Sequence, residues 1–248
     1  MDKSKLKPAI IVGAAVVIAA VGYPFYFDWW DHRNCTESGG TWKSGYTSAE
    51  SRQAVKFWTD LVTVHKVAPP AAAAWNEVDA RTQFATGKAA MAFGGSWQQA
   101  AMLEADPNLD KVWGTFPVPG PTGGESPAFA GGSDIAIWED SKAKDVAWDY
   151  TTVLLDKQNN KKYADSLKFF PVYSDLIASG YNDDKIMAAF AASMKSTKLT
   201  PMTPKWVEVS RTKTVTQAMN SAIMKGQKTV DQATTDAAAE IESILNAK

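Results

Sequence analysis

The residues best suited to chemistry lie at the end of the stretch from Arg81 to Trp97, where Gly94-Gly95-Ser96 is followed directly by Trp97. The turn carries no bulky side chain, so a ligand can reach its backbone N–H donors before it meets the indole ring. Hydrogen bonds along polar edges, with stacking on an apolar face, suit a sugar. We therefore predict Gly94, Gly95, Ser96 and Trp97 as ligand contacts. The alternative is a strand, a turn and a tryptophan buried in the core.

The other reactive side chains do not predict an enzyme. His65 has no carboxylate-and-nucleophile pattern near it, which favours a surface histidine at a helix end over a catalytic base. Asp and Glu pairs occur throughout, but none is isolated in an apolar setting that would tune an acid, so a glycan hydrolase is the weakest alternative. We predict no catalytic residue.

Cofactor and metal sites are not expected either. The loop G-P-T-G-G-E-S-P lacks the Gly-Lys-Ser/Thr that follows a phosphate loop. With two separated histidines, His32 and His65, and the single Cys35, a His/Cys-rich metal site is not predicted. The single cysteine also excludes an internal disulfide.

Composition indicates an ordinary globular protein. The 248 residues are 45% hydrophobic and 21% charged, which is enough to bury a core in one large or two small domains. A net charge of −1 without a long basic run gives no footprint for nucleic acid. The aromatic content of 11% fits a carbohydrate binder without identifying one, because aromatic residues also fill cores.

Helices and short strands must position the glycine turn. Ser48 caps a helix that stops by Pro69-Pro70, and Trp75 to Ala85 forms a second helix with Gly87 in the left-handed position after it. The remaining expectations are strands at Ala89 to Phe93, Trp113 to Val118 and Ile135 to Trp138, and helices at Ala100 to Asp106, Ala143 to Leu155 capped by Asp140 or Ser141, Lys157 to Ala164, Ile186 to Met194, Val207 to Met224 and Val230 to Leu245.

Two segments resemble the extracellular solute-binding proteins that deliver sugars to ABC-type importers. In that family a helix is followed by F-x-x-G-x-A-A-M and x-G-x-W, with the tryptophan at the sugar cleft; here the segment reads F-A-T-G-K-A-A-M, then G-G-S-W. The family also ends in a glycine turn and a helix opening in V-x-x-A-L, which Lys225 to Ala233, K-G-Q-K-T-V-D-Q-A, matches with Thr229 as the cap.

The resemblance adds further ligand contacts. Gly131, Gly132 and Ser133 are similar to a second cleft-lining glycine turn, although glycines before a strand are as often a bulge or a tight bend. Trp206 lies in a proline-flanked segment similar to one whose aromatic residue faces the sugar. The segment Lys168 to Tyr173 is similar to a stretch that crosses the cleft, but Phe170 departs from the usual small residue.

The resemblance implies an α/β fold of two lobes with the sugar between them and closure by a hinge. It covers residues 46–248, about the C-terminal half of the family fold, so the first lobe is expected to be incomplete. Residues 46–113 and 172–248 would form the second lobe and residues 114–171 part of the first. It implies a binding protein without cofactor, partnered by the importer's membrane subunits. The alternative is a membrane-anchored interaction domain with a degenerate cleft.

The N-terminal region predicts export. Lys3, Lys5 and Lys7 precede residues 8–27, which carry no charge and are long enough to span a bilayer. We expect residues 1–27 to be a transmembrane anchor, residues 28–45 a linker, and residues 46–248 the solute-binding domain outside the cytoplasmic membrane. The anchored domain would lie on the periplasmic or extracellular face; the alternative is a signal peptide cleaved near Ala20-Val21-Gly22, which leaves the domain secreted.

Overall fold

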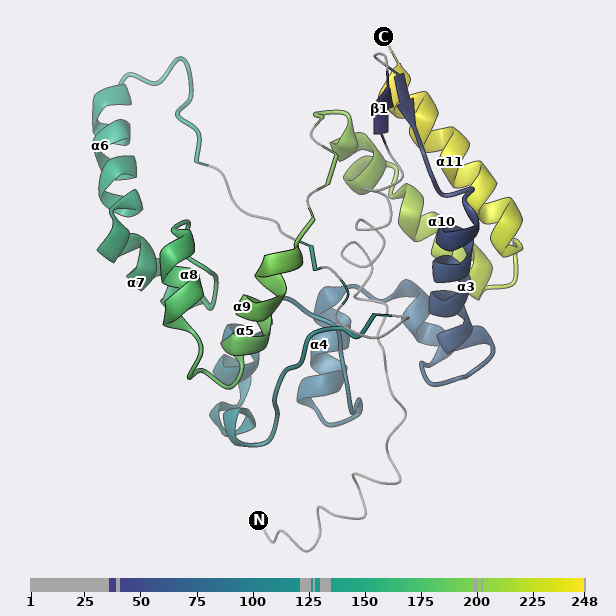
Figure 1. Ribbon diagram of the computed structural model, residues 1–248, viewed down its shortest axis with the longest axis horizontal. Helices are drawn as coiled ribbons and strands as arrows, with labels where there is room; N and C mark the ends of the chain where they lie inside the picture. The colour runs from purple at the N-terminus through teal and green to yellow at the C-terminus, as the bar shows by residue number, and fades with distance from the viewer. Residues whose placement is uncertain are drawn as a thin grey trace, which may run out of the picture. The chain divides into compact units, whose positions relative to one another are not determined.

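The chain divides into two compact units, each described by itself. The computed structural model describes residues 36–38, 41–120, 126, 128, 129, 135–198, 200, 201 and 203–247. Unit 1 contains the chain up to Gly94 and again from Lys198, and unit 2 runs from Gly95 to Thr197 (Figure 1). The discontinuous sharing of the chain matches the expectation, but the divisions fall at these residues instead of near 113 and 171.

Unit 1 is built mainly from helices. Its elements are β1 (Thr36–Ser38), β2 (Thr41–Lys43), α3 (Ala49–Thr63), the 3-10 helix η3 (Pro70–Ala74), α4 (Glu77–Ala85), the π-helical segment η6 (Glu208–Thr212), α10 (Val215–Met224) and α11 (Val230–Asn246). Helices α3, α10 and α11 pack against one another. Their apolar faces, with η6, enclose a core that includes Val55, Trp58, Val209, Met219 and Ile241.

Side-chain caps fix where the helices of unit 1 begin. Ser48 accepts a hydrogen bond from the backbone N–H of Ser51 at 3.2 Å, as predicted for the start of α3. At α11 the Thr229 hydroxyl accepts from the N–H of Gln232, and the Gln232 side chain accepts from the N–H of Thr229. This reciprocal capping box satisfies two donors that the helix itself cannot pair. The predicted role of Thr229 is confirmed.

Glycines in the left-handed region end two helices of unit 1. Gly87 has φ 72° after α4 and Gly226 has φ 68° after α10. Beyond α10, the N–H of Gln227 donates to the carbonyl of Ala222 at 2.8 Å, which completes a Schellman turn. The expected helix end at Gly87 is confirmed.

Unit 2 holds shorter helices. They are α5 (Gln98–Ala105), the 3-10 helix η4 (Pro107–Lys111), α6 (Lys144–Leu155), α7 (Lys157–Leu167), α8 (Ser174–Gly180), α9 (Met187–Ser193) and the 3-10 helix η5 (Met194–Ser196). Polar contacts join them: the Thr115 hydroxyl donates to the carbonyl of Ile186 at 2.6 Å, and Lys185 donates to the carbonyl of Asp110. These contacts attach the segment after residue 172 to residues 110–115, so the described residues on both sides of the division predicted at 171 belong to one unit.

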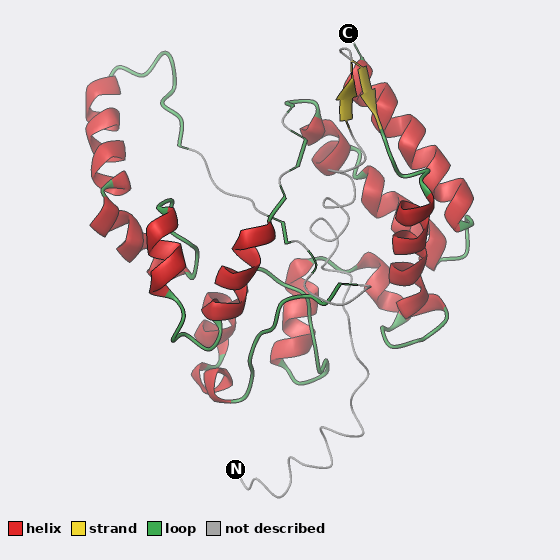
Figure 2. Cartoon of the chain, viewed as in Figure 1, coloured by secondary structure: helices red, strands yellow, loops and turns green. Residues whose placement is uncertain are grey.

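The predicted strands are absent from the described part of the chain. Residues 89–93, 113–118 and 135–138 have no regular secondary structure, and the strands there are β1 and β2 alone, antiparallel with Glu37 opposite Trp42 (Figure 2). A strand needs a neighbour to pair its backbone N–H and C=O groups. Among the described residues, these segments have no ladder of backbone hydrogen bonds; the N–H of Ser126 donates to the carbonyl of Val118 at 2.7 Å, but this contact alone does not make a strand.

Two helix predictions also need correction. The helix expected from Val207 to Met224 is interrupted, because Thr214 has φ 48° between η6 and α10. The cap predicted for α6 does not form on its first turn: the Ser141 hydroxyl accepts from the N–H of Ala143, and Ala143 itself occupies the cap position. Both differences arise from the local backbone conformation, which the spacing of apolar residues does not predict.

The proposed membrane anchor lies outside the described residues. Within the part of the chain that the structure describes, no helix is both long and apolar enough to cross a bilayer. Residues 8–27, on which the anchor was predicted, belong to the part not described.

Candidate solute-binding site

The predicted glycine turn leads straight into helix α5. The N–H of Gln98 donates to the carbonyl of Gly95, and the N–H of Gln99 to that of Ser96, both at 3.1 Å. The backbone N–H groups of Gly95 and Ser96 have no hydrogen-bond partner among the described residues. Trp97 is half-buried and occupies the cap position of α5. The turn therefore keeps backbone donors beside an aromatic ring, although Ser96 is only 6% exposed, and the role of these residues in ligand contact stays a prediction.

Gly95 is required by the position of the Trp97 ring. A Cβ atom built on Gly95 would overlap the Cη2 and Cζ3 atoms of that ring. The indole therefore lies directly over the glycine, and any side chain at position 95 would displace it. This is a packing reason for glycine, since Gly95 is not among the residues with positive φ.

A second aromatic ring lies beside Trp97, and the sequence did not single it out. The ring centroids of Trp97 and Phe169 are 6.0 Å apart, with an angle of 33° between the planes. Phe169 is 41% exposed. The sequence drew attention to Phe170 instead, whose ring packs edge-on against Tyr181 with centroids 5.1 Å apart. The signal available was the pair of phenylalanines before Pro171, and only the fold decides which one turns toward Trp97.

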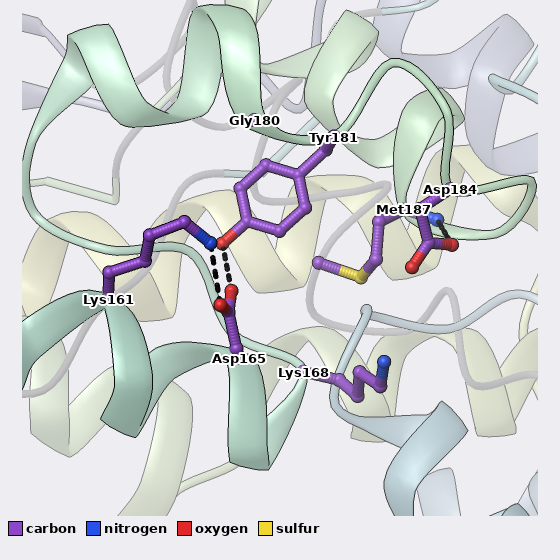
Figure 3. A pocket seen from close by; sticks show the side chains of 7 residues that line it. All are labelled: Lys161, Asp165, Lys168, Gly180, Tyr181, Asp184 and Met187. Atoms are coloured by element: carbon purple, nitrogen blue, oxygen red, sulfur yellow. Dashed lines mark hydrogen bonds and ion pairs between the residues drawn. The ribbon is translucent and has the colours of Figure 1, made fainter.

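A polar pocket of about 270 Å³ lies in unit 2 between α7 and the segment that joins α8 to α9 (Figure 3). Its side chains include Lys161, Asp165, Lys168, Tyr181 and Asp184. Asp165 accepts hydrogen bonds on both carboxylate oxygens, from Lys161 Nζ and from the Tyr181 hydroxyl, each at 2.6 Å. The Lys161 ammonium also lies 5.3 Å from the centre of the Tyr181 ring.

These contacts set the titration of both acids. Burial works to raise the pKa of Asp165, but the hydrogen bonds from Lys161 and Tyr181 outweigh it, and the pKa is lowered. Burial, and then the hydrogen bond to Asp165, raises the pKa of Tyr181 above its usual value. Because each oxygen of Asp165 already accepts a hydrogen bond from within unit 2, the cluster ties α7 to the segment around Tyr181.

The other predicted contacts are not brought to this turn by any described contact. Gly131, Gly132 and Ser133 lie outside the described residues. Gly94 is exposed and is the last residue of this part of unit 1. Trp206 is 5% exposed within the core of unit 1, and its Nε1–H has no partner among the described residues. Their roles in ligand binding stay predictions. No group of three or more His, Cys, Asp or Glu suited to a metal occurs among the described residues.

Comparison with known families decides the identity of the chain. The sequence model of the bacterial extracellular solute-binding protein family matches residues 3–161. The chain belongs to this family. Solute-binding proteins are not enzymes, so the prediction of a binding protein without catalytic activity is confirmed. The match begins at residue 3, although the resemblance seen in the sequence began at residue 46.

Two curated relatives of this solute-binding protein are similar over different lengths. The diacetylchitobiose binding protein DasA of Streptomyces coelicolor is 27% identical over 151 residues, which cover 60% of this chain and 35% of DasA. A putative binding protein of Brucella abortus is 24% identical over 225 residues, covering 90% of this chain and 53% of that protein. The chain thus spans about half the length of these relatives, or less.

Solved structures show the fold. Maltose-bound MalE3 of T. maritima superposes with a TM-score of 0.72 at 22% identity, covering 87% of this chain and 55% of that one. The maltose-maltodextrin binding protein of Alicyclobacillus acidocaldarius gives a TM-score of 0.68 at 19% identity, covering 91% and 60%. Such neighbours have the two-lobed fold of periplasmic binding proteins. The predicted fold is confirmed at this level, with the described part helix-rich and partial.

Proposed function

We propose that this solute-binding protein binds a sugar outside the cytoplasmic membrane and presents it to the membrane subunits of an ABC-type importer. The observation that carries the proposal is the half-exposed Trp97 ring beside the backbone N–H groups of Gly95 and Ser96, which have no hydrogen-bond partner among the described residues. Stacking covers the apolar C–H face of a sugar, while N–H donors bind its hydroxyl groups. The relatives named for diacetylchitobiose and maltose support a sugar as the solute.

Calorimetric titration of the 248-residue chain tests the proposal. The probes are glucose, maltose, N-acetylglucosamine and N,N′-diacetylchitobiose. Stacking on the indole at about 25 cal/mol per Å² is worth roughly 1–2 kcal/mol, so we expect Trp97→Ala to weaken binding about tenfold. Trp138→Ala is the matched control, because Trp138 is also in unit 2 and is 76% exposed. A folded chain that binds none of the four sugars would refute the proposal.

Gly95→Ala provides a second, independent variant. The new methyl group displaces the Trp97 indole without removing it, so we expect a loss of sugar affinity similar to that of Trp97→Ala. Gly114→Ala is the control, because a Cβ at Gly114 meets nothing within 4 Å. Full affinity in Gly95→Ala would show that the orientation of the indole is unimportant.

A membrane-anchored interaction domain is the second candidate function. Helix α6 exposes the apolar side chains of Val146, Tyr150 and Val153, which share one face at helical spacing, and also that of Trp148; exposed apolar groups of this kind are a feature of interaction surfaces. If no sugar binds while the chain is folded by circular dichroism, this function takes precedence.

We further propose that residues 8–27 anchor the exported domain. The uncharged span after three lysines supports this, and the alternative is cleavage of a signal peptide. Membrane fractionation with N-terminal sequencing distinguishes the two. An anchored chain keeps Met1 and sediments with the membrane, whereas a soluble product that begins at Tyr23 shows cleavage.

A further inference from the structure

We infer that the polar pocket between α7 and the segment that joins α8 to α9 binds a small zwitterion, a molecule with one carboxylate and one ammonium group on a short carbon chain. All the residues that line the pocket belong to unit 2. Its volume of about 270 Å³ holds a ligand much larger than a water molecule. The ligand differs in class from a sugar, so the inference goes beyond the proposed function.

The charged side chains of the pocket divide into a paired set and an unpaired set. Lys161 and Asp165 form an ion pair at 2.6 Å, and the other oxygen of Asp165 accepts from the Tyr181 hydroxyl. The ammonium of Lys168 forms no hydrogen bond or ion pair with any of the residues that the structure describes. The groups that remain for a ligand are therefore the Lys168 ammonium and the carboxylate of Asp184.

Asp184 is held in place but keeps one oxygen for a ligand. Its Oδ1 atom accepts from the backbone N–H groups of Ile186 and Met187, both at 2.9 Å. Its Oδ2 atom accepts no hydrogen bond from the described part of the chain. Figure 3 shows the Asp184 carboxylate and the Lys168 ammonium at the same pocket, where they form no ion pair with each other. A ligand with both charges can bridge them.

The balance of charge in the pocket favours a ligand of zero net charge. Two lysines and two aspartates line it, so a free anion meets the repulsion of two carboxylates and a free cation that of two ammonium groups. Between them lies the side chain of Met187, which is 1% exposed and offers an apolar surface. A short carbon chain that carries opposite charges at its ends matches all three features.

The backbone at Lys168 gives independent support for a role of its side chain. Lys168 has φ 58°, in the left-handed region that glycine adopts without steric cost. A residue held in such a conformation is often found where its side chain has a function. The same feature provides a useful variant, because Lys168→Gly removes the ammonium and at the same time relieves the backbone.

NMR titration of the full chain tests the inference. The probes are glycine, β-alanine and γ-aminobutyrate, which differ in the separation of their charges, with propionate and propylammonium as molecules that carry one charge each. We expect saturable shifts at the pocket with at least one amino acid. The two singly charged molecules should bind about tenfold more weakly, because each loses one charge-assisted hydrogen bond.

Matched variants assign the binding to the pocket. Lys168→Gly and Asp184→Asn should each weaken amino-acid binding about tenfold, whereas Lys168→Arg keeps the charge and most of the affinity. Asp184→Asn retains a side-chain oxygen for the backbone N–H groups that Asp184 binds. The controls are Lys162→Met and Asp183→Asn, because Lys162 and Asp183 are exposed neighbours that do not line the pocket.

The outcomes separate this inference from the proposed function. If the chain binds a sugar but none of the three amino acids, the inference fails and sugar binding stands. If an amino acid binds and no sugar does, the inference stands and the proposed function fails. Propionate that binds as tightly as the amino acids would reduce the pocket to an anion site and overturn the inference. Amino-acid affinity that is unchanged in both Lys168→Gly and Asp184→Asn would place the binding elsewhere and overturn it as well.

Discussion

The two units use similar apolar helices in opposite ways. In unit 1, α3, α10 and α11 turn their apolar stripes toward one another, and Trp58 is 2% exposed. In unit 2, α6 packs on α7, while Trp148 on α6 is 61% exposed. The difference shows that an apolar helix becomes part of a core only when the fold supplies a partner for its stripe.

Unit 2 instead depends strongly on polar contacts. The Tyr173 hydroxyl donates to the carbonyl of Leu155, and the Asn160 side chain accepts from the N–H of Val172. With the Lys161–Asp165–Tyr181 cluster, these bonds connect α6, α7 and the segment that carries Phe169. Each such bond contributes about 0.5–1.5 kcal/mol, which is less than the burial of a large side chain.

The largest expected effect compares the same substitution in the two units. Trp58→Ala leaves a large cavity in a closed core and should lower the free energy of unfolding by about 3–5 kcal/mol. Trp148→Ala removes a mainly exposed ring and should change it by less than about 0.5 kcal/mol. Chemical denaturation followed by circular dichroism measures both. Equal losses of unfolding free energy in the two variants would show that Trp148 is buried in solution.

The next comparison concerns helix ends in the left-handed region. Unit 1 places Gly226 there after α10, whereas unit 2 places Lys168 there after α7. Gly226→Ala should destabilise unit 1 by about 1 kcal/mol, and Lys168→Gly should stabilise unit 2 by a similar amount, because only glycine adopts this conformation without steric cost. Thermal melting of both variants checks that the melting temperature falls in Gly226→Ala and rises in Lys168→Gly. A lower melting temperature in Lys168→Gly would mean that contacts of the Lys168 side chain stabilise the fold by more than the left-handed conformation destabilises it.

Capping provides a similar contrast between the units. Thr229→Ala removes the capping box of α11 and should cost about 1 kcal/mol, while Thr229→Ser keeps the hydroxyl and should cost much less. Helix α6, with Ala143 at its cap position, has no side-chain cap of this kind to lose. Denaturation midpoints of the two Thr229 variants give the measurement. Equal midpoints for Thr229→Ala and Thr229→Ser would show that the capping box does not stabilise unit 1.

The smallest expected effect is the pH dependence of unit 2. The pKa of Asp165 is lower in the fold than the unfolded value of about 3.9, so its contribution is present above about pH 4 and is lost as the pH falls through the folded pKa. Asp165 is partly exposed, so less than about 1 kcal/mol is involved. Tyr181→Phe removes one hydrogen bond to the carboxylate and should flatten this acid dependence. If stability falls with decreasing pH in the same way in Tyr181→Phe as in the unaltered chain, the acid dependence comes from other carboxylates.

Helices and their caps were the most predictable features. Ser48 and Thr229 cap the helices expected of them, because a hydroxyl followed by an apolar-periodic run is a local signal. Helix α8 was missed, since Ser174–Gly180 is too short to show a clear period. The strand at 89–93 failed for the opposite reason, because strands depend on distant neighbours that a local pattern does not contain.

The candidate site was only partly visible in the sequence. The glycine turn and Trp97 were found because small residues before an aromatic ring form a recognisable pattern. Phe169 was missed because Phe169 and Phe170 are chemically identical, and only tertiary contacts separate their roles. The burial of Trp206 could not be foreseen either, because the core that encloses it includes residues distant in the sequence, such as Val55 and Ile241.

The adjacent phenylalanines also determine how this segment can change during evolution. Phe169 contacts Trp97 and Phe170 contacts Tyr181, so the spacing between α7 and Pro171 decides which ring meets which neighbour. Substitution of either ring by another aromatic residue preserves the arrangement. Insertion or deletion of one residue shifts both rings to the wrong neighbours at once. Homologous lineages should therefore vary in residue type at these two positions far more readily than in the length of the loop that carries them.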